Sequence, residues 1–270
     1  MTTDLLAGIT VLDFGTVGPA ARASAILADY GAQVTKVGAV PRSGTVTITP
    51  PAFAYSGGRG TRRVQLDLKS DRGRAAAQAL AAASDVVIES FRPGVADRLG
   101  IGWDELSKLN PGLVYCSTSG YGQDGPASQR AGHDLNYLAV GGFLDCSGRR
   151  EDGGPALPGA TVADIAAGGM QAAMAIMASL IGRGTSGEGR YLDVSIADGV
   201  VAMMSLYVDE YLVTGAEPGP GHNVLTGRYA WYGIYRCADG GWISVGAIEP
   251  KFYANLLLEL GLDAERFGSG

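Results

Sequence analysis

Short apolar runs alternate with amphipathic stretches through the first 120 residues. The apolar runs occupy residues 9–14, 33–37, 85–89 and 113–118. The stretches with helical spacing are 20–30, about 70–83 and 103–109. Ser70 is the expected N-cap of the second helix, and Gly31 follows the end of the first. Strands at this spacing, with helices between them, predict right-handed βαβ crossovers and a mostly parallel, Rossmann-like sheet.

The pattern changes after about residue 125. Helical spacing recurs at 133–144, 164–181 and 195–213, followed by a predicted β-hairpin over 232–237 and 242–245. Pro250 directly after Glu249 is a favourable first residue for a last helix. We therefore predict an α/β protein in three segments. They are a Rossmann-like domain over 1–125, linking helices over 126–195 that contain the candidate functional residues described below, and a smaller helical and hairpin domain over 196–270.

Composition and charge narrow the classes of function. The net charge of −6 argues against nucleic acid as the main partner, although a local Arg and Lys cluster can still hold an anionic ligand. The three cysteines, Cys116, Cys146 and Cys237, are far apart and form no CxxC pair, so we expect free thiols. With two histidines and no ligand cluster in the sequence, we expect no metal site.

Two apolar features bear on location. Residues 165–181 are almost continuously apolar, but Gln171 lies among them and Asp164 precedes them, which favours a buried helix over a membrane span. The N-terminus has no basic stretch followed by an apolar one, as a secretory signal would have. We expect a cytoplasmic protein without a membrane partner.

Three ionisable residues stand out by their surroundings. His133 begins a predicted helix, Asp164 begins the long Ala- and Gly-rich helix, and Glu249 lies between a strand and a helix. Taken singly, each has a structural explanation: Asp164 and Glu249 as helix N-caps and His133 as a hydrogen-bonded core residue. The sequence contains no P-loop, no GxSxG nucleophile motif and no HExxH motif.

Several ordered motifs extend over almost the whole chain. They are GITVLD at 8–13, LADYGA at 27–32, VTKV at 34–37, LDLKS at 66–70, DVVIESFRPG at 85–94, RLG at 98–100, NP at 110–111, LVYC at 113–116, GYGQDGP at 120–126, GHDLNYLA at 132–139, ADI at 163–165 and VGAIEPKF at 245–252. Through their order and spacing, the chain resembles the family III CoA-transferase superfamily. The His-Asp pair and the GAIEP element are most similar to its α-methylacyl-CoA racemase branch.

The resemblance implies roles for the three ionisable residues. In the racemase branch the residue at His133 is one acid/base and is held by the residue at Glu249, while the residue at Asp164 is the opposing acid/base. In the transferase branch the same aspartate is the nucleophile that forms an acyl-aspartyl anhydride. The substrate is an acyl-CoA in both branches, and neither a metal nor a separate cofactor is implied.

These residue types suit inversion at a carbon beside a thioester. One group must remove the α-proton on one face while the other delivers a proton on the opposite face, in opposite protonation states. An imidazole and a carboxylate can both be tuned toward neutral pH. Backbone N–H groups at the helix start formed by Gly132, His133 and Asp134 are candidates for stabilising the enolate oxygen.

The resemblance also implies a site for the CoA phosphates near the strand ends of the first domain. The residues that we predict for CoA binding are Lys36, Arg42, Arg62, Arg63, Lys69 and Arg92, together with Asp134 and Tyr137 at the helix that follows His133. For any one of the cations, a solvated surface charge is an equally good explanation. Met170, Met174 and Met177 form a stripe that favours core packing over contact with an acyl chain.

The chain departs from the family pattern in three places. Residues 227–231 read GRYAW where racemases have GGAP, and Gly38 replaces an acidic residue after the second strand. Family members also continue into a segment that returns to the first domain, and this fold would lack it. We therefore expect an interlocked homodimer, or a further subunit that supplies that segment. Three functions stay open: a racemase, a CoA transferase acting through Asp164, and an inactive CoA-binding or scaffolding subunit.

Overall fold

Six parallel strands form the central sheet of the computed structural model, which describes residues 4–15, 17–40 and 58–267. The strand order is β3-β2-β1-β4-β5-β6. The strands are β1 Thr10–Asp13, β2 Gln33–Gly38, β3 Arg62–Gln65, β4 Val86–Glu89, β5 Val114–Ser119 and β6 Arg190–Ser195. The predicted mostly parallel sheet is confirmed, and its order is that of a Rossmann fold.

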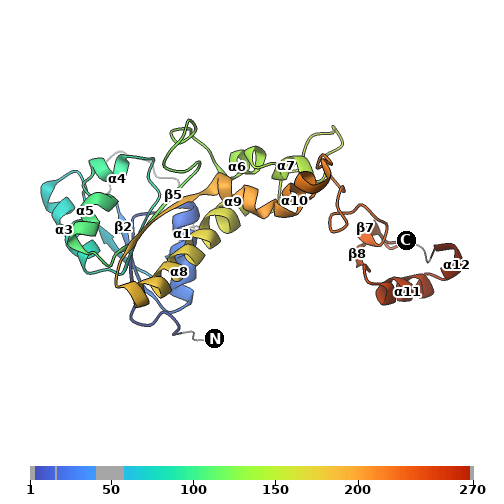
Figure 1. Cartoon of the computed structure of the whole chain (residues 1–270), viewed down its shortest axis with the longest axis horizontal. Helices are drawn as coiled ribbons and strands as arrows, with labels where there is room; N and C mark the ends of the chain where they lie inside the picture. The colour runs from blue at the N-terminus through green and yellow to red at the C-terminus, as the bar shows by residue number, and fades with distance from the viewer. Residues whose placement is uncertain (1–3, 16, 41–57, 268–270) are drawn as a thin grey trace. The chain divides into compact units, whose positions relative to one another are not determined.

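Helices cover both faces of this sheet, as a parallel sheet requires (Figure 1). Helices α1 (Gly18–Asp29) and α8 (Gln171–Ser186) pack on one face, around Val11, Val86 and Ile176. On the other face lie α3 (Asp71–Ala82), α4 (Val95–Arg98) and α5 (Trp103–Leu109). Burial on both faces explains why the central strands read as continuous apolar runs.

The sequence analysis missed two strands, and both are edges of the sheet. β3 reads RRVQ and is mostly exposed, so it offers no apolar run to recognise. β6 reads RYLDVS and is half polar because only its last residues are buried. An edge strand is paired on one side only and needs fewer apolar side chains. The helix N-cap at Ser70 is confirmed, since Gly73 N–H donates to its hydroxyl at 3.1 Å.

The helices that follow β5 differ in extent and regularity from the predicted segments. They are α6 Asp134–Val140, α7 Phe143–Cys146, the π-helix η1 Ala163–Met170 that continues into α8, α9 Ile196–Met203 and α10 Ser205–Thr214. The predicted single helix over 164–181 therefore begins with a wider π-helical segment. The joined helix Ala163–Ser186 is long and apolar enough to span a membrane, but its residues Ala172, Ala173 and Ile176 pack into the core of the sheet.

The methionine stripe is divided between core and surface. Met177 packs against the core cluster beneath α8, as predicted. Met170 and Met174 are about half exposed, so core packing does not explain them. The three cysteines are free thiols, as the sequence analysis expected.

The chain divides into two compact units, residues 1–142 with 158–204 and residues 143–157 with 205–270. The second unit contains the predicted antiparallel hairpin, β7 Tyr232–Arg236 with β8 Trp242–Gly246, and the helices α11 Pro250–Glu259 and α12 Ala264–Phe267. These boundaries differ from the three predicted segments, because β6 and α9 belong to the unit that contains the sheet.

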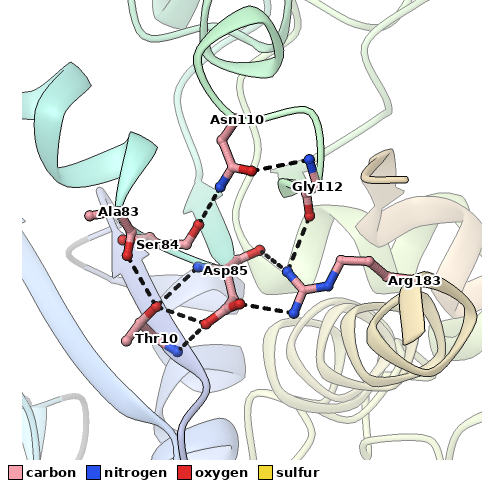
Figure 2. Close-up of polar contacts among 7 residues, drawn as sticks. All are labelled: Thr10, Ala83, Ser84, Asp85, Asn110, Gly112 and Arg183. Carbon is pink, nitrogen blue, oxygen red and sulfur yellow. Dashed lines mark hydrogen bonds and ion pairs between the residues drawn. The ribbon is translucent and has the colours of Figure 1, made fainter. Parts of the chain in front are cut away.

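A polar network joins the amino-terminal ends of three strands to α8 (Figure 2). Asp85 accepts the backbone N–H and the hydroxyl of Thr10, each at 2.8 Å, and pairs with Arg183 at 2.9 Å. Arg183 also donates to Gly112 O at 3.1 Å. Burial opposes ionisation of Asp85, but these donors outweigh it and hold its pKa below the usual value. The network holds the sheet and α8 together at the edge opposite to the strand carboxyl ends.

A second polar contact is buried inside the sheet unit. The ammonium group of Lys36 on β2 donates to the Asp13 carboxylate, to Ser24 Oγ at 3.0 Å and to Gly15 O at 3.3 Å. The Asp13 side chain is fully buried and that of Lys36 is 10% exposed. Burial raises the pKa of Asp13, while Lys36 and the hydrogen bonds oppose that shift.

Removal of Lys36 will therefore destabilise the fold strongly. The Lys36→Ala variant leaves a buried carboxylate without its cation, which costs about 3–5 kcal/mol in free energy of unfolding. Lys69→Ala, at an exposed lysine, is the matched control and should stay within about 0.5 kcal/mol. Urea denaturation measures both. Equal, small losses for the two variants would show that the buried pair does not support the fold.

Candidate functional site

The sheet order reverses between β1 and β4, and in folds of this kind ligands bind in a crevice that is expected beyond the carboxyl ends of two such strands. The chain after β1 is tied to β4, because Phe14 N–H donates to Ile88 O at 2.8 Å. Gly15 then passes the loop after β4 closely: a Cβ there would lie 3.2 Å from Ser90 Oγ and 2.3 Å from the Ala20 side chain. Only glycine fits this approach, so the two loops form one side of the crevice.

Asp164 lies beside this crevice, at the start of α1. Its Oδ2 atom is 3.9 Å from the position that a Cβ on Gly18 would occupy. Gly18 is the first residue of α1 and has a φ of +67°, a conformation that favours glycine. The amino-terminal end of a helix attracts negative charge, so α1 favours the ionised form of the Asp164 carboxyl.

The π-helix that contains Asp164 packs closely against its neighbouring helices at three glycines. Added Cβ atoms would lie 2.7 Å from Pro19 at Gly168 and 2.6 Å from the Arg22 side chain at Gly169. On another side, a Cβ at Gly199 of α9 would lie 2.2 Å from Ala167 O. Such close packing of backbones leaves Asp164 little freedom to move. Single π-turns of this kind are frequent at functional sites.

His133 lies at the start of the neighbouring helix α6, where it is exposed to solvent. Its backbone N–H donates to Asn136 Oδ1 at 3.0 Å, which fixes the turn into the helix. The next residue, Asp134, accepts the backbone N–H of Asp164 at 2.8 Å. The predicted pair of His133 and Asp164 is thus brought together through Asp134. Sequence analysis had assigned Asp134 to ligand binding, whereas its carboxylate is engaged here with the π-helix.

Three charged side chains act on the Asp164 carboxyl. Burial raises its pKa above the usual value, and the Asp134 carboxylate adds to that shift. His133 and Arg22 act in the opposite direction. A carboxyl whose proton affinity is raised, beside an imidazole, is suited to acid/base chemistry near neutral pH.

Tyr137 of α6 has a structural place behind this turn. Its hydroxyl donates to Gly132 O at 2.8 Å, and its ring lies where a side chain at Gly120 or Gly132 would stand. Burial raises the pKa of Tyr137 to about 12. The ring supports the loop that leads to His133, and its predicted role in CoA binding stays a prediction.

Glu249 lies in the second compact unit. It is the N-cap residue of α11, is exposed, and makes no side-chain capping bond. The resemblance pairs it with His133, which belongs to the first unit. That pairing stays a prediction.

Known proteins are similar to this chain in sequence and in fold. The model of the CoA-transferase family III matches residues 6–268. The chain belongs to this family. The human α-methylacyl-CoA racemase is 37% identical over 263 residues, covering 96% of this chain and 66% of that protein. The human succinyl-CoA:glutarate CoA-transferase is 33% identical over 265 residues, covering 95% and 59%.

The structural comparison agrees. A CaiB/BaiF family protein from Brucella suis has a TM-score of 0.81 and 29% identity, covering 96% of this chain and 70% of that one. The predicted family III fold is confirmed. The chain spans about two thirds of the length of the human racemase.

Among the cations predicted to bind CoA in this family III chain, Lys36 has to be reassigned. Its ammonium group has three protons and three protein acceptors, Asp13, Ser24 and Gly15. No proton is therefore left to donate to a phosphate. The side chain is also buried inside the unit, where a phosphate cannot reach it. Lys36 is a structural residue of the β1–β2 pair.

The other predicted cations lie far apart on the sheet, and Arg42 lies outside the described residues. Arg62 and Arg63 are exposed on the edge strand β3, and Lys69 is exposed before α3. Arg92 follows β4, three strands away from β3, which is roughly 14 Å at a spacing of about 4.8 Å per strand. This distance suits opposite ends of an extended nucleotide better than a single phosphate. Their contact with CoA stays a prediction.

Arg92 also lines a polar cavity of about 230 Å³ that the sequence did not suggest. The cavity contains the carboxyl of Glu89, which is nearly fully buried at the end of β4. Its Oε2 accepts Phe91 N–H at 2.7 Å, and its Oε1 accepts the Ser117 hydroxyl. Burial raises the pKa of Glu89 to about 7, against the effect of both donors, and the Asp97 and Asp193 charges add to the rise.

Two residues were missed, Arg22 beside Asp164 and Glu89 in the polar cavity, although each left a signal in the sequence. Arg22 lies four residues after Gly18 and therefore on the same face of α1, next to Asp164. Glu89 ends an apolar strand, where a carboxylate at a strand carboxyl end often faces a crevice. Neither signal identifies a functional residue unless the order of the strands in the sheet is known.

The pKa of Glu89 predicts how stability depends on pH. The folded chain binds this proton more tightly than the unfolded chain, where the pKa is about 4.3. Stability from this group is therefore present below about pH 4.3 and is lost as the pH rises through about 7, by at most about 4 kcal/mol.

The Glu89→Gln variant keeps a neutral group of the same shape and removes this loss. Urea unfolding of both proteins at pH 5 and pH 8 measures it: relative to the wild type, the variant should gain stability at pH 8. An identical change between the two pH values in both proteins would refute the assignment.

Proposed function

We propose that this chain inverts the configuration at the α-carbon of a 2-methyl-branched acyl-CoA by proton transfer between two groups. The observation that carries the proposal is the placement of Asp164. Its carboxyl is held at the reversal point of the sheet, with a raised pKa, beside the helix start that carries His133. The 37% identity to the human α-methylacyl-CoA racemase supports the same reaction.

In one direction, the Asp164 carboxylate removes the α-proton from one face of the substrate. The electron pair of that C–H bond moves to the thioester carbonyl and forms an enolate. The His133 imidazolium then donates its proton to the opposite face, and the carbonyl is restored. The product has the opposite configuration, Asp164 is protonated and His133 is neutral, which is the state required for the reverse direction.

The second candidate is CoA transfer between carboxylic acids. The Asp164 carboxylate would attack the thioester carbonyl, displace the CoA thiolate and form a mixed anhydride. The thiolate would then attack the Asp164 carbonyl, which releases the donor acid and leaves a CoA thioester on Asp164. The acceptor carboxylate would attack that thioester to form a second anhydride, and the CoA thiolate set free would take up its acyl group, which gives the new acyl-CoA and restores Asp164. The position of Arg22 beside Asp164 favours this candidate, because a guanidinium group binds carboxylates well. The 33% identity to the human succinyl-CoA:glutarate CoA-transferase also supports it.

Four further expectations from the sequence are part of this proposal. They are the stabilisation of the enolate by N–H groups before α6, the pairing of Glu249 with His133, a cytoplasmic location and the interlocked dimer. The third possibility from the sequence is a binding subunit without turnover, and a measurement of turnover would exclude it.

Incubation with one enantiomer of a 2-methylacyl-CoA in deuterated water should put deuterium on the α-carbon and invert its configuration. The Asp164→Ala and His133→Ala variants should each slow inversion of configuration by about 10²–10⁴-fold, because inversion needs a proton-transfer group on each face. Asp71→Asn, an exposed first-turn aspartate of α3, is the control and should exchange like the wild type. Mass spectrometry and chiral chromatography measure the outcome.

A parallel incubation with a free dicarboxylic acid separates the two candidates. The transferase would replace the racemase as the proposed function on two results. The substrate would keep all of its α-protium in the presence of folded protein, and CoA transfer would persist in the His133→Ala variant. Absence of both reactions would leave the binding subunit.

A further inference from the structure

One carboxylate connects the two helix starts of the site. Asp134 is the first residue of α6, and its Oδ1 accepts the backbone N–H of Asp164 at 2.8 Å. The two residues are thirty positions apart in the chain. The bond therefore joins the turn after His133 to the beginning of the π-helix.

The bond meets a need of the π-helix itself. The first N–H groups of a helix have no partner within the helix, and Asp164 is the second residue of η1. Asp134 is partly buried, and a hydrogen bond to an ionised carboxylate is stronger than one between neutral groups. The Asp134 side chain thus fixes the backbone of the residue whose carboxyl faces the crevice.

The other end of the connection is equally well held. Asn136 Oδ1 accepts the His133 N–H at 3.0 Å, and the Tyr137 hydroxyl donates to Gly132 O at 2.8 Å. These contacts leave the α6 turn little freedom. Asp134 therefore joins two well-held segments, which are the turn at the start of α6 and the π-helix that packs through its glycines.

The same side chain places a negative charge beside the Asp164 carboxyl. Like charge disfavours ionisation, so Asp134 contributes to the raised pKa of Asp164. The other groups around Asp164 are His133 and Tyr137 from α6 and Arg22 from α1. Of the charged groups, His133 and Arg22 act in the opposite direction to Asp134.

We propose that Asp134 is the positioning residue of the proton transfer, fixing the backbone of Asp164 relative to His133 and placing a negative charge beside the Asp164 carboxyl. It touches the acid/base residue and need not touch the substrate. The inference rests on the proposed function, because it assigns Asp134 a role in that reaction.

Two substitutions separate the hydrogen bond from the charge. Asp134→Asn keeps an oxygen acceptor of the same shape and removes the charge, whereas Asp134→Ala removes both. Carbon-13 NMR of labelled aspartate carboxyls, assigned with Asp164→Asn, follows the titration of Asp164 without any substrate. The pKa of Asp164 should fall in Asp134→Asn, and Asp71→Asn, the matched first-turn control, should leave it unchanged.

The α-exchange reaction supplies the second readout. In Asp134→Asn, the limb of the pH profile that reports Asp164 should move to lower pH, while kcat at its optimum stays within a fewfold of the wild type. In Asp134→Ala, kcat should fall on the order of 10²-fold with little change in KM, because the carboxyl of Asp164 is misplaced. Partial recovery of kcat on going from the Ala to the Asn variant identifies the hydrogen bond as the positioning element.

The results that overturn the inference are distinct from those that overturn the reaction. If Asp164 titrates in Asp134→Asn as it does in the wild type, Asp134 does not act on it electrostatically. If the folded Asp134→Ala variant retains the wild-type kcat, Asp134 does not position Asp164. Because the NMR titration needs no turnover, a wild-type protein without α-exchange would end the proposed function and leave the electrostatic link to be decided by the titration. Asp134→Asn retains the bond, so the titration does not depend on the folding of the Ala variant.

Discussion

Backbone contact between helices is the constraint on which the site depends. The π-helix approaches α1 and α9 so closely that Gly168, Gly169 and Gly199 have no room for a side chain. This packing seats Asp164 above Gly18, at the point where the strand order reverses. Burial raises the pKa of this partly buried carboxyl, and the Asp134 carboxylate adds to that shift.

The charges around the sheet are divided by function. Lys36 and Asp13 form a buried pair under the β1 loop, and Asp85 with Arg183 joins the opposite edge to α8. These pairs fix the elements and have their charges satisfied within the protein. The Asp164 carboxyl is different, because the groups acting on it, Asp134, His133 and Arg22, carry charges of both signs.

Much of the fold could be predicted from the sequence, because the central strands are buried on both faces and read as apolar runs. The edge strands β3 and β6 could not, because their polar residues face solvent. The residues His133 and Asp164 were found through family motifs, while their connection through Asp134 depends on a contact between distant segments. The burial of Lys36 was also invisible, since a lysine in a strand reads the same whether it meets a phosphate or Asp13.

The central claim is that Asp164 and His133 act on opposite faces of one carbon. A crystal structure of the protein with a bound 2-methylacyl-CoA tests this most directly. The α-carbon should lie about 3–3.5 Å from an oxygen of Asp164 on one face and from an imidazole nitrogen of His133 on the other. A thioester bound with both groups on the same face, or with its α-carbon away from Asp164, would contradict the claim.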